Sequence, residues 1–303
     1  MPGRVFVLFN PSAGKGRCAK RIGFFLDLLG RHLKEFRHTV TARAGDEDAV
    51  VDRALAEGYD TIVAVGGDGT WSRAADRIVR NGRNDVALGL LAGGTGNDFG
   101  KSVGVTFDRS EESVRAIAEG RRSRIDVGRV GDRHFLNVVG FGFDIAVIDD
   151  AASTPLLKGD VLYRFCAAKQ LFRFPGLPLD IAAGEEPSRR IDHLMLIIAN
   201  ARIFGGSFRI APRADLSDGM LDLVSIGNAG PLRRAKLFDL VARGRHTEEP
   251  EVEMLRAPSF RVGFRAPLRY EVDGEVVAAD GEALEVASVP SALDLLAPGD
   301  LRS

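Results

Sequence analysis

Three glycine-rich segments, each placed directly after a short apolar run, constrain the fold of this chain most. They are NPSAGKGR (10–17), GGDGT (66–70) and GGTGNDF (93–99). Each apolar run has the length of one buried strand, and segments 20–33 and 46–58 between them have the apolar spacing of helices. Strands that alternate with helices predict a parallel sheet covered on both faces, with ligands bound at the carboxyl ends of the strands.

After about residue 125 the pattern changes to short β-rich runs separated by Gly, Pro and Asp, as in HLMLIIANA (193–201) and MLDLVSIG (220–227). These runs predict an antiparallel sheet or sandwich, interrupted by helical stretches around 155–174 and 231–243. The predicted fold class is therefore α/β plus all-β.

Two domains follow from this change of pattern. The first is an N-terminal parallel α/β domain at 1–125, which the last segment, 290–303, could rejoin. The second is a C-terminal antiparallel β-sandwich domain at 126–289.

Composition excludes several classes of protein. The 303 residues carry a net charge of −1, so a basic nucleic-acid-binding surface is not expected. No apolar stretch approaches the ~18–20 residues of a membrane span, which predicts a cytoplasmic protein. The two cysteines, Cys18 and Cys166, match no metal spacing and form no disulfide framework.

The glycine segments have a chemical interpretation. Glycine permits positive φ and close approach of the backbone, so successive N–H groups can point at one anion, and a following helix N-terminus adds positive potential. One such segment alone is more often a simple turn, but three on one sheet edge favour a polyphosphate ligand. Neither a Walker A loop nor the dinucleotide-binding GxGxxG fingerprint is present.

The order of motifs resembles a known family. GGDGT followed about 25 residues later by GGTGNDF is similar to the catalytic domain of the diacylglycerol kinase and sphingosine kinase-like lipid kinases, including the bacterial diacylglycerol kinases. The resemblance continues through 135–144, 200–224 and YEVDGE (270–275). It implies an ATP-dependent lipid kinase with a phosphofructokinase-like nucleotide-binding domain, a β-sandwich acceptor domain and an active site in the interdomain cleft.

The resemblance implies a set of nucleotide-binding residues in the first domain. They are Asn10, Thr41, Gly66, Gly67, Asp68, Gly69, Thr70, Ser72 and Thr95. Asp68 is also the strongest catalytic candidate, because phosphoryl transfer needs a carboxylate to orient the attacking hydroxyl or a metal; the alternative is an Asx-type turn residue. Trp71, Ser72 and Arg73 stand where the family usually has Asn and Glu, and Ala92 replaces a common proline.

Acidic residues form a candidate metal site in the second domain. Asp215 and Asp218 lie three apart beside Gly219, and two carboxylates with a backbone carbonyl suit a hard cation. The resemblance implies a structural Mg²⁺ with ligands at 215, 218 and Met220. An Asp-rich hairpin turn is the alternative.

A candidate proton acceptor lies in the first of two DGE sequences, at Asp273–Glu275 rather than Asp280–Glu282. The resemblance implies this choice, because the first DGE lies at about the family's distance from the closing segment and the second lies too near it. The resemblance implies that this motif accepts the proton of the lipid hydroxyl. Glu275 is the preferred residue, with Asp273 supporting it, and the choice between them stays open. An ordinary hairpin turn is the alternative.

These observations predict an ATP- and Mg²⁺-dependent lipid kinase with a diacylglycerol-like acceptor. A NAD kinase-like enzyme shares the GGDGT loop, but GGTGNDF argues against it. A nucleotide- or lipid-binding regulator without turnover is supported only by the altered helix after GGDGT. The expected partners are ATP, a lipid substrate and, transiently, a membrane surface contacted by the basic amphipathic segment 156–174, with no nucleic acid. A homodimer is left open.

Overall fold

The computed structural model describes residues 3–43, 45–154, 159–206 and 208–299. The chain divides into two compact units. Unit 1 comprises Met1–Asn137, Asp215–Gly219 and Val289–Ser303, and unit 2 comprises Val138–Ala214 and Met220–Ser288. Unit 1 is thus assembled from three separate segments of the chain.

The centre of unit 1 is a parallel sheet in the order β2-β1-β3-β4-β15. Its strands are β1 (Val5–Phe9), β2 (Arg37–Val40), β3 (Thr61–Gly66), β4 (Ala87–Ala92) and the end of β15 (Ala283–Leu296). Every residue of β1, β3 and β4 is buried, as expected of parallel strands covered on both faces. Two further strands, β5 (Arg122–Val130) and β6 (Arg133–Phe135), form an antiparallel pair, and β5 also pairs with β15.

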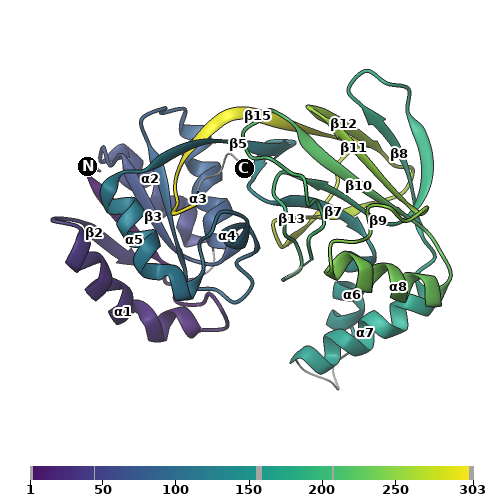
Figure 1. Cartoon of the computed structure of the whole chain (residues 1–303), viewed down its shortest axis with the longest axis horizontal. Helices are drawn as coiled ribbons and strands as arrows, with labels where there is room; N and C mark the ends of the chain where they lie inside the picture. Colours follow the sequence, from purple (N-terminus) through teal and green to yellow (C-terminus); the bar gives the residue numbers. More distant parts are fainter. Residues whose placement is uncertain (1–2, 44, 155–158, 207, 300–303) are drawn as a thin grey trace. The chain divides into compact units, whose positions relative to one another are not determined.

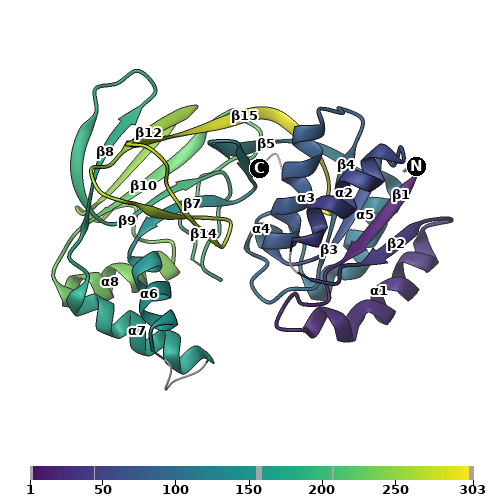
Figure 2. The ribbon, with the colours of Figure 1, turned by 180° about the vertical axis from the view of Figure 1, so that it is seen from behind.

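Helices cover both faces of this sheet. The helices of unit 1 are α1 (Arg17–His32), α2 (Asp46–Ala56), α3 (Asp68–Asn81), α4 (Asp98–Ser102) and α5 (Ser110–Glu119), with a 3₁₀ turn at Phe107–Arg109. α1 and α5 lie on one face (Figure 1), and α2 and α3 pack together on the other (Figure 2). In α1 the residues Phe25, Leu28 and Leu29 recur at helical spacing and are fully buried in the core beneath that face.

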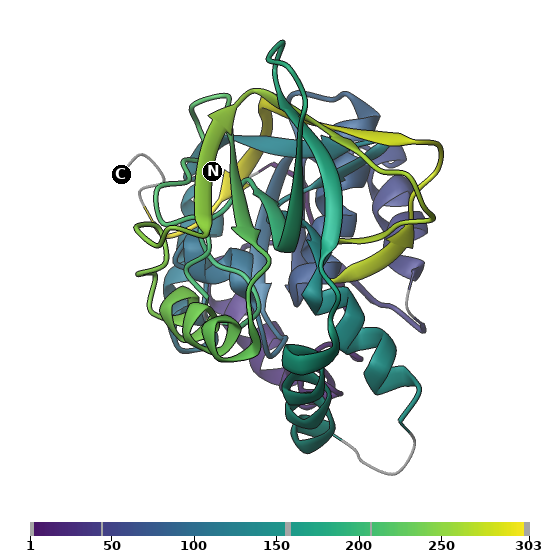
Figure 3. The ribbon, with the colours of Figure 1, turned by 90° about the vertical axis from the view of Figure 1, so that its right-hand side faces the viewer.

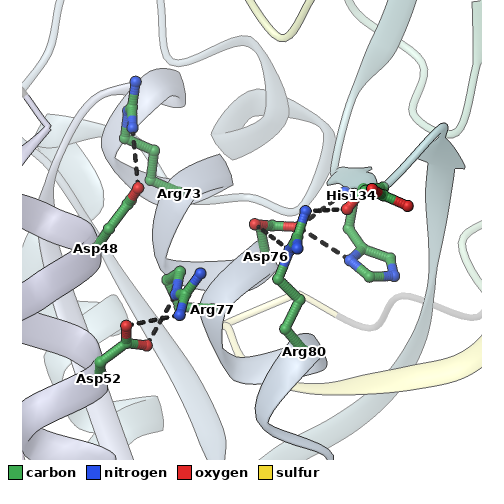
Figure 4. Close-up of polar contacts among 8 residues, drawn as sticks. Asp48, Asp52, Arg73, Asp76, Arg77, Arg80 and His134 are labelled. Atoms are coloured by element: carbon green, nitrogen blue, oxygen red, sulfur yellow. Dashed lines mark hydrogen bonds and ion pairs between the residues drawn. The ribbon is translucent and has the colours of Figure 1, made fainter.

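Charged pairs fasten α3 to its neighbours (Figure 4). Arg73 contacts Asp48 of α2 at 3.2 Å, so its side chain points at α2. One turn further along α3, Arg77 forms a two-point ion pair with Asp52 of α2.

Asp76 of α3 is held by several hydrogen bonds. Its Oδ1 accepts the backbone N–H of His134 at 2.9 Å and lies 2.9 Å from His134 Nδ1, while Arg80 Nε donates to it from the next turn (Figure 4). Burial alone would raise the pKa of Asp76, but the bonds from His134 and Arg80 outweigh it and lower the pKa to about 2.

Replacing Asp76 by asparagine should therefore lower the free energy of unfolding by about 2 kcal/mol at neutral pH. A lowered pKa stabilises the folded state above the ordinary value of 3.8, and this contribution is lost as the pH falls through about 2. Denaturant unfolding should show a smaller difference in the free energy of unfolding between variant and wild type near pH 3 than at pH 7. Asp239→Asn, which removes an exposed pair with Arg243, is the matched control and should change little at either pH. An equal loss for Asp76→Asn at both values would contradict the assignment.

Unit 2 is built on antiparallel strands, in the order β14-β13-β7-β9-β8-β12-β15, with β10 and β11 attached through β9. The strands are β7 (Val138–Gly142), β8 (Leu177–Ala183), β9 (Arg189–Ala199), β10 (Leu221–Gly227), β11 (Val252–Ala257), β12 (Ser259–Gly263), β13 (Arg269–Val272) and β14 (Glu275–Ala278). The long strand β9 organises this part, because it pairs with β7 and β8 on one edge and with β10 on the other.

Three helices, α6 (Phe143–Ala152), α7 (Gly159–Arg173) and α8 (Pro231–Ala242), lie together at one end of unit 2 (Figure 3). They cover an apolar cluster that includes Val138, Leu194 and Leu237. Arg234 of α8 is buried, and its guanidinium donates to the carbonyl oxygens of Leu171 and Phe174, both at 2.8 Å, which closes the end of α7. Among the described helices, none has the length and apolar character needed to cross a bilayer.

The predicted fold class is confirmed, with a parallel α/β part followed by an antiparallel β part. The two expected helical stretches of the second half correspond to α7 and α8. The sequence interpretation did not anticipate α6, β8 and β11. Residues 156–158 of the proposed membrane segment lie outside the described residues, and α7 begins at Gly159.

Candidate functional site

The three glycine segments meet at the carboxyl edge of the parallel sheet of unit 1. The amides of Gly93 and Gly94 donate to the carbonyl oxygen of Gly66 at 2.7 and 2.9 Å. The first segment reaches the third, since a Cβ added to Gly14 would lie 3.2 Å from the Oγ1 of Thr95. Parallel strands end on the same edge of a sheet, so β1, β3 and β4 bring their loops together.

Close packing between the second and third segments requires glycine at position 94. A Cβ there would lie 2.7 Å from the Cα of Gly67 and 2.6 Å from the Oδ1 of Asn97, closer than Cβ atoms are found in proteins. Nothing in the described chain lies within 4 Å of a Cβ added to Gly69, so the first turn of α3 is open there.

Asp68 is the first residue of α3, and its carboxylate reaches the third glycine segment. Oδ1 accepts the backbone N–H of Phe99, in α4, at 3.0 Å. Oδ2 would be 3.3 Å from a Cβ at Gly96. This hydrogen bond joins residues 31 positions apart, so Asp68 connects the second glycine segment to the third. An Asx turn, by contrast, would bond only to a neighbouring residue.

A hydrogen-bonded chain links Asn10, Thr70 and Glu47. The side-chain amide of Asn10 donates to Thr70 Oγ1 at 2.9 Å and to Glu47 Oε1 at 2.8 Å. The second oxygen of Glu47 accepts the amide of Gly45 at 2.9 Å, and Glu47 is 2% exposed. Asn10 is therefore held in one orientation by a buried carboxylate on α2. Glu47 could not be predicted as a site residue, because in the sequence it is only one of three acidic residues at a helix start.

The other predicted nucleotide residues occupy different environments. Thr41, directly after β2, is buried, and its hydroxyl donates to the carbonyl oxygen of Phe9 at 3.3 Å. Ser72 is buried in α3, and its hydroxyl has no hydrogen-bond partner among the residues that the structure describes. Thr95 is exposed on the third glycine segment. Thr95 and the open turn at Gly69 are thus free to contact a ligand, whereas Thr41 supports the edge of the sheet.

Two residues of GGTGNDF that had no predicted role are built into this site. Asn97 has φ +50° and is 8% exposed, and its Oδ1 has no partner within the described chain. Asp98 starts α4 and forms an ion pair with Lys101 at 3.1 Å. The signal for both was their position directly after a glycine run.

This arrangement fits a nucleotide polyphosphate. The open first turn of α3 leaves amides without partners inside the helix and carries its positive end, both of which favour an anion. The glycines at 67 and 94 let the second and third segments pack closely beside this open turn, and the buried oxygens of Ser72 and Asn97 behind it have no hydrogen-bond partner among the described residues.

The candidate Mg²⁺ residues lie at a junction of the chain. Asp215 and Asp218 belong to the short segment assigned to unit 1, and Met220 is the next residue after it. Asp215 Oδ1 accepts the N–H and the hydroxyl of Ser217 at 2.9 and 2.8 Å, which closes a local turn. Within the described ranges no three His, Cys, Asp or Glu side chains gather as metal ligands, so a cation here would need the backbone carbonyl and solvent as well.

Asp126 on β5 anchors this same segment to unit 1. Its carboxylate accepts the amide of Gly219 at 2.6 Å and that of Ser291 at 2.7 Å, and its own amide donates to the carbonyl oxygen of Leu216 at 2.6 Å. Asp126 is 1% exposed. One buried carboxylate therefore holds two chain segments that are distant from it in sequence.

The DGE motif of unit 2 forms the turn between β13 and β14. Asp273 and Gly274 have φ of +47° and +89°, as a two-residue hairpin turn between right-twisted strands requires, and Val272 faces Glu275 across it. Asp273 is buried and its Oδ1 accepts the amide of Val138 at 2.9 Å, whereas Glu275 is partly exposed on β14. The motif therefore does form a hairpin turn. Its two carboxylates differ, because Asp273 is bonded to β7 and Glu275 lies nearer to solvent.

Two family models match the chain. The "Diacylglycerol kinase catalytic domain" matches residues 4–130, and the "YegS C-terminal NAD kinase beta sandwich-like domain" matches residues 137–297, more than half of the chain.

Similar proteins cover the chain almost completely. A diacylglycerol kinase of Mycobacterium tuberculosis is 29% identical over 98% of this chain and 96% of its own length. One from Staphylococcus saprophyticus is 26% identical over 90% of this chain and 88% of its own. A crystal structure of a diacylglycerol kinase from Bacillus anthracis superimposes with a TM-score of 0.74 at 18% identity, over 97% of this chain and 96% of that one, which supports the fold. Together with the glycine loops and the β-sandwich, these matches show that the chain belongs to the diacylglycerol kinase-like lipid kinase family.

Proposed function

We propose that this lipid kinase transfers the γ-phosphate of ATP to the hydroxyl of a diacylglycerol-like acceptor in a Mg²⁺-dependent reaction. The observation that carries the proposal is the meeting of three glycine segments at the first turn of α3, where Asp68 begins the helix. We further propose that unit 1 is the nucleotide-binding domain and unit 2 the acceptor domain.

In this proposal the residues have separate tasks. The backbone of Gly66, Gly67 and Gly69 surrounds the phosphates, Thr70 and Asn10 fix the loop between Glu47 and α3, and Asp68 orients charge at the transferring group. Mg²⁺, when bound with the nucleotide, would neutralise charge on the phosphates.

The proton of the lipid hydroxyl must pass to a base. Glu275 is our choice, because Asp273 already accepts an amide of β7 and is buried, while Glu275 is more accessible.

An acceptor panel tests the proposal. Protein and γ-labelled ATP are incubated with diacylglycerol, sphingosine, NAD or buffer alone, and the label is followed into product. Label in a phosphorylated diacylglycerol supports the proposal. Label in sphingosine would show that the protein is a lipid kinase with a different acceptor. Label in NAD would favour the NAD kinase-like alternative. Label only in free phosphate, or nowhere, would favour a binding regulator.

The metal proposal has a readout that does not need turnover. We propose that Asp215, Asp218 and the main chain of Met220 hold a structural Mg²⁺. Millimolar Mg²⁺ should then raise the melting temperature of the wild type, because an ion bound only to the folded state stabilises it. Replacing Asp215 and Asp218 together by alanine should abolish that rise, whereas Asp192→Ala should preserve it. If Mg²⁺ does not raise the melting temperature of the wild type, the segment is an ordinary Asp-rich turn and the metal proposal fails.

We also propose that unit 2 contacts the membrane surface through its helices. Phe165 and Phe172 lie seven residues apart on α7 and are 51% and 71% exposed, and Leu232 at the start of α8 is 87% exposed. The ends of α7 and α8 are joined through Arg234, so these apolar side chains share one end of the unit. Of the cations expected to help, Arg173 is exposed and Lys169 is paired with Asp150, while Lys158 and the side chain of Arg164 lie outside the described residues.

Replacing Phe172 and Leu232 by serine should reduce the affinity for anionic vesicles in co-sedimentation by about a hundredfold or more, since each side chain contributes roughly 1.5–3 kcal/mol when fully buried. Activity on vesicle-borne lipid should fall with binding, and activity on a detergent-dispersed short-chain acceptor should survive. Phe24→Ser, at an exposed phenylalanine of α1, is the control and should leave vesicle binding intact. Equal losses with both acceptors would mean that these residues support the fold or the acceptor site.

A further inference from the structure

Unit 2 buries two carboxyl groups against each other, from Asp144 in the first turn of α6 and Glu271 on β13. Glu271 is 7% exposed, and both carboxylate oxygens of Asp144 are buried. Glu271 faces Gly140 of β7, and a Cβ at Gly140 would lie 3.1 Å from Asp144 Oδ2 and 3.8 Å from the Cβ of Glu271. Glycine at 140 leaves room for the two carboxyl groups to approach each other, and neither oxygen of Asp144 has a hydrogen-bond partner among the other described groups, so the Glu271 carboxyl is the donor that it faces.

The surrounding elements offer no counter-charge within the described part of unit 2. β7 and the facing stretch of β9, Leu194–Ala199, contain no titratable residue. Arg269, two residues before Glu271, is paired with Asp149 of α6, and Lys169 of α7 is paired with Asp150. Of the other described titratable groups of α7, Arg173 is exposed and Cys166 is buried in the apolar cluster, and the charged groups that follow Glu271 in sequence are acidic.

These acidic neighbours are Asp273, two residues after Glu271, and Glu275 across the turn. Burial is the largest influence on both carboxyl groups and raises the pKa of each. For Glu271 the charges of Asp144 and Asp273 and the hydrogen bond to Asp144 raise the pKa further, well above the ordinary range. Two carboxyl groups can hydrogen-bond only when one carries a proton, so Glu271 is the donor and Asp144 the acceptor.

We propose that Glu271 and Asp144 hold one shared proton and act as positioning residues for the Asp273–Glu275 turn. This inference rests on the proposed function of that turn. Asp273 is fastened to β7 twice: its carboxylate accepts the amide of Val138, and its own amide donates to the Val138 carbonyl oxygen at 3.1 Å. Loss of the shared proton places a second negative charge two residues from Asp273 and weakens that hold. The orientation of Glu275, and with it proton acceptance, then fails at alkaline pH.

The first arm of the test measures unfolding by denaturant across pH and needs no activity. A raised carboxyl pKa stabilises the folded state fully below the ordinary value, and the contribution disappears as the pH rises through the raised value. The unfolding equilibrium constant of the wild type should therefore increase by up to tenfold per pH unit over that window, for one proton.

Glu271→Gln supplies an amide that donates to Asp144 at every pH, so the dependence on pH should vanish in this variant. Asp144→Asn supplies a donor from the other side but leaves Glu271 buried beside Asp273, so in this variant the dependence on pH should weaken without vanishing; it replaces the first variant if that one does not fold. Glu285→Gln, at an exposed residue paired with Arg261, is the control and should keep the wild-type slope. A wild-type slope in Glu271→Gln and Asp144→Asn would overturn the shared proton.

The second arm measures kcat and the KM for ATP against pH with a detergent-dispersed acceptor. In the wild type kcat should fall on the alkaline side while the KM for ATP stays constant, because the nucleotide loops belong to unit 1. In Glu271→Gln that alkaline fall should be absent. The same fall in both proteins would overturn the positioning role. If no lipid is phosphorylated at any pH, the proposed function fails, and the unfolding arm still decides whether the proton is shared.

Discussion

Replacing Asp68 by asparagine is expected to lower kcat by about three orders of magnitude while leaving the fold intact. The asparagine side-chain oxygen can still accept the amide of Phe99, the bond that ties α3 to α4. What the variant loses is the negative charge at the transferring group, which acts mainly in the transition state. The effect should therefore appear in kcat and kcat/KM together, with a smaller change in the KM for ATP.

Steady-state kinetics with thermal unfolding as a parallel measurement would check this expectation. Asp48→Asn is a matched control, because it also removes one carboxylate next to α3 but from an ion pair with Arg73 on a partly exposed surface. Near-normal turnover in Asp68→Asn would show that the residue serves only to connect the two loops. A large loss of melting temperature would assign the effect to folding.

The second large effect is expected at Asp126. Alanine at this position removes the buried carboxylate that accepts the partly buried amides of Gly219 and Ser291, and short bonds from amides to a carboxylate are among the stronger hydrogen bonds in proteins. We expect a loss of about 4 kcal/mol in the stability of unit 1. Asparagine keeps one acceptor oxygen and should lose about half as much.

Hydrogen exchange shows where in the chain Asp126→Ala lowers stability and by how much. The amides of Gly219 and Ser291 should exchange much faster in Asp126→Ala, while amides of the central strand β9 in unit 2 keep their protection. Asp215→Asn disturbs only the local turn at Ser217 and is the control. Unchanged exchange at Gly219 and Ser291 would contradict the anchoring role.

The meeting of the glycine segments could be predicted because it depends on local rules. Apolar runs followed by glycine mark strands that end in ligand loops, and parallel strands place those loops on one edge. The order of the motifs then identified the family. The roles assigned to Asp68, Thr95 and Glu275 stay predictions.

Other features depend on contacts that no local pattern contains. The partners of Asp126 lie 93 and 165 positions away, so its sequence surroundings show only an acidic residue in a strand. Helix α6 follows a buried strand and contains Phe, Ile and Val, which are residues typical of strands, so tertiary packing overrides local propensity there. Glu271 is an acidic residue in a short strand and is predicted to lie at the surface until Gly140 and Asp144 are placed against it.

The assembly of unit 1 from three segments has a consequence for how the protein folds during synthesis. Strand β4 pairs with β3 on one edge but gains its second parallel neighbour from Asp294–Leu296, about two hundred residues further along the chain. Until those residues leave the ribosome, the apolar strand β4 forms an open edge of the sheet, and such an edge can pair wrongly with another chain. Unit 2 can complete its pairing earlier, so we expect the later-synthesised unit to fold first and the sheet of unit 1 to close last.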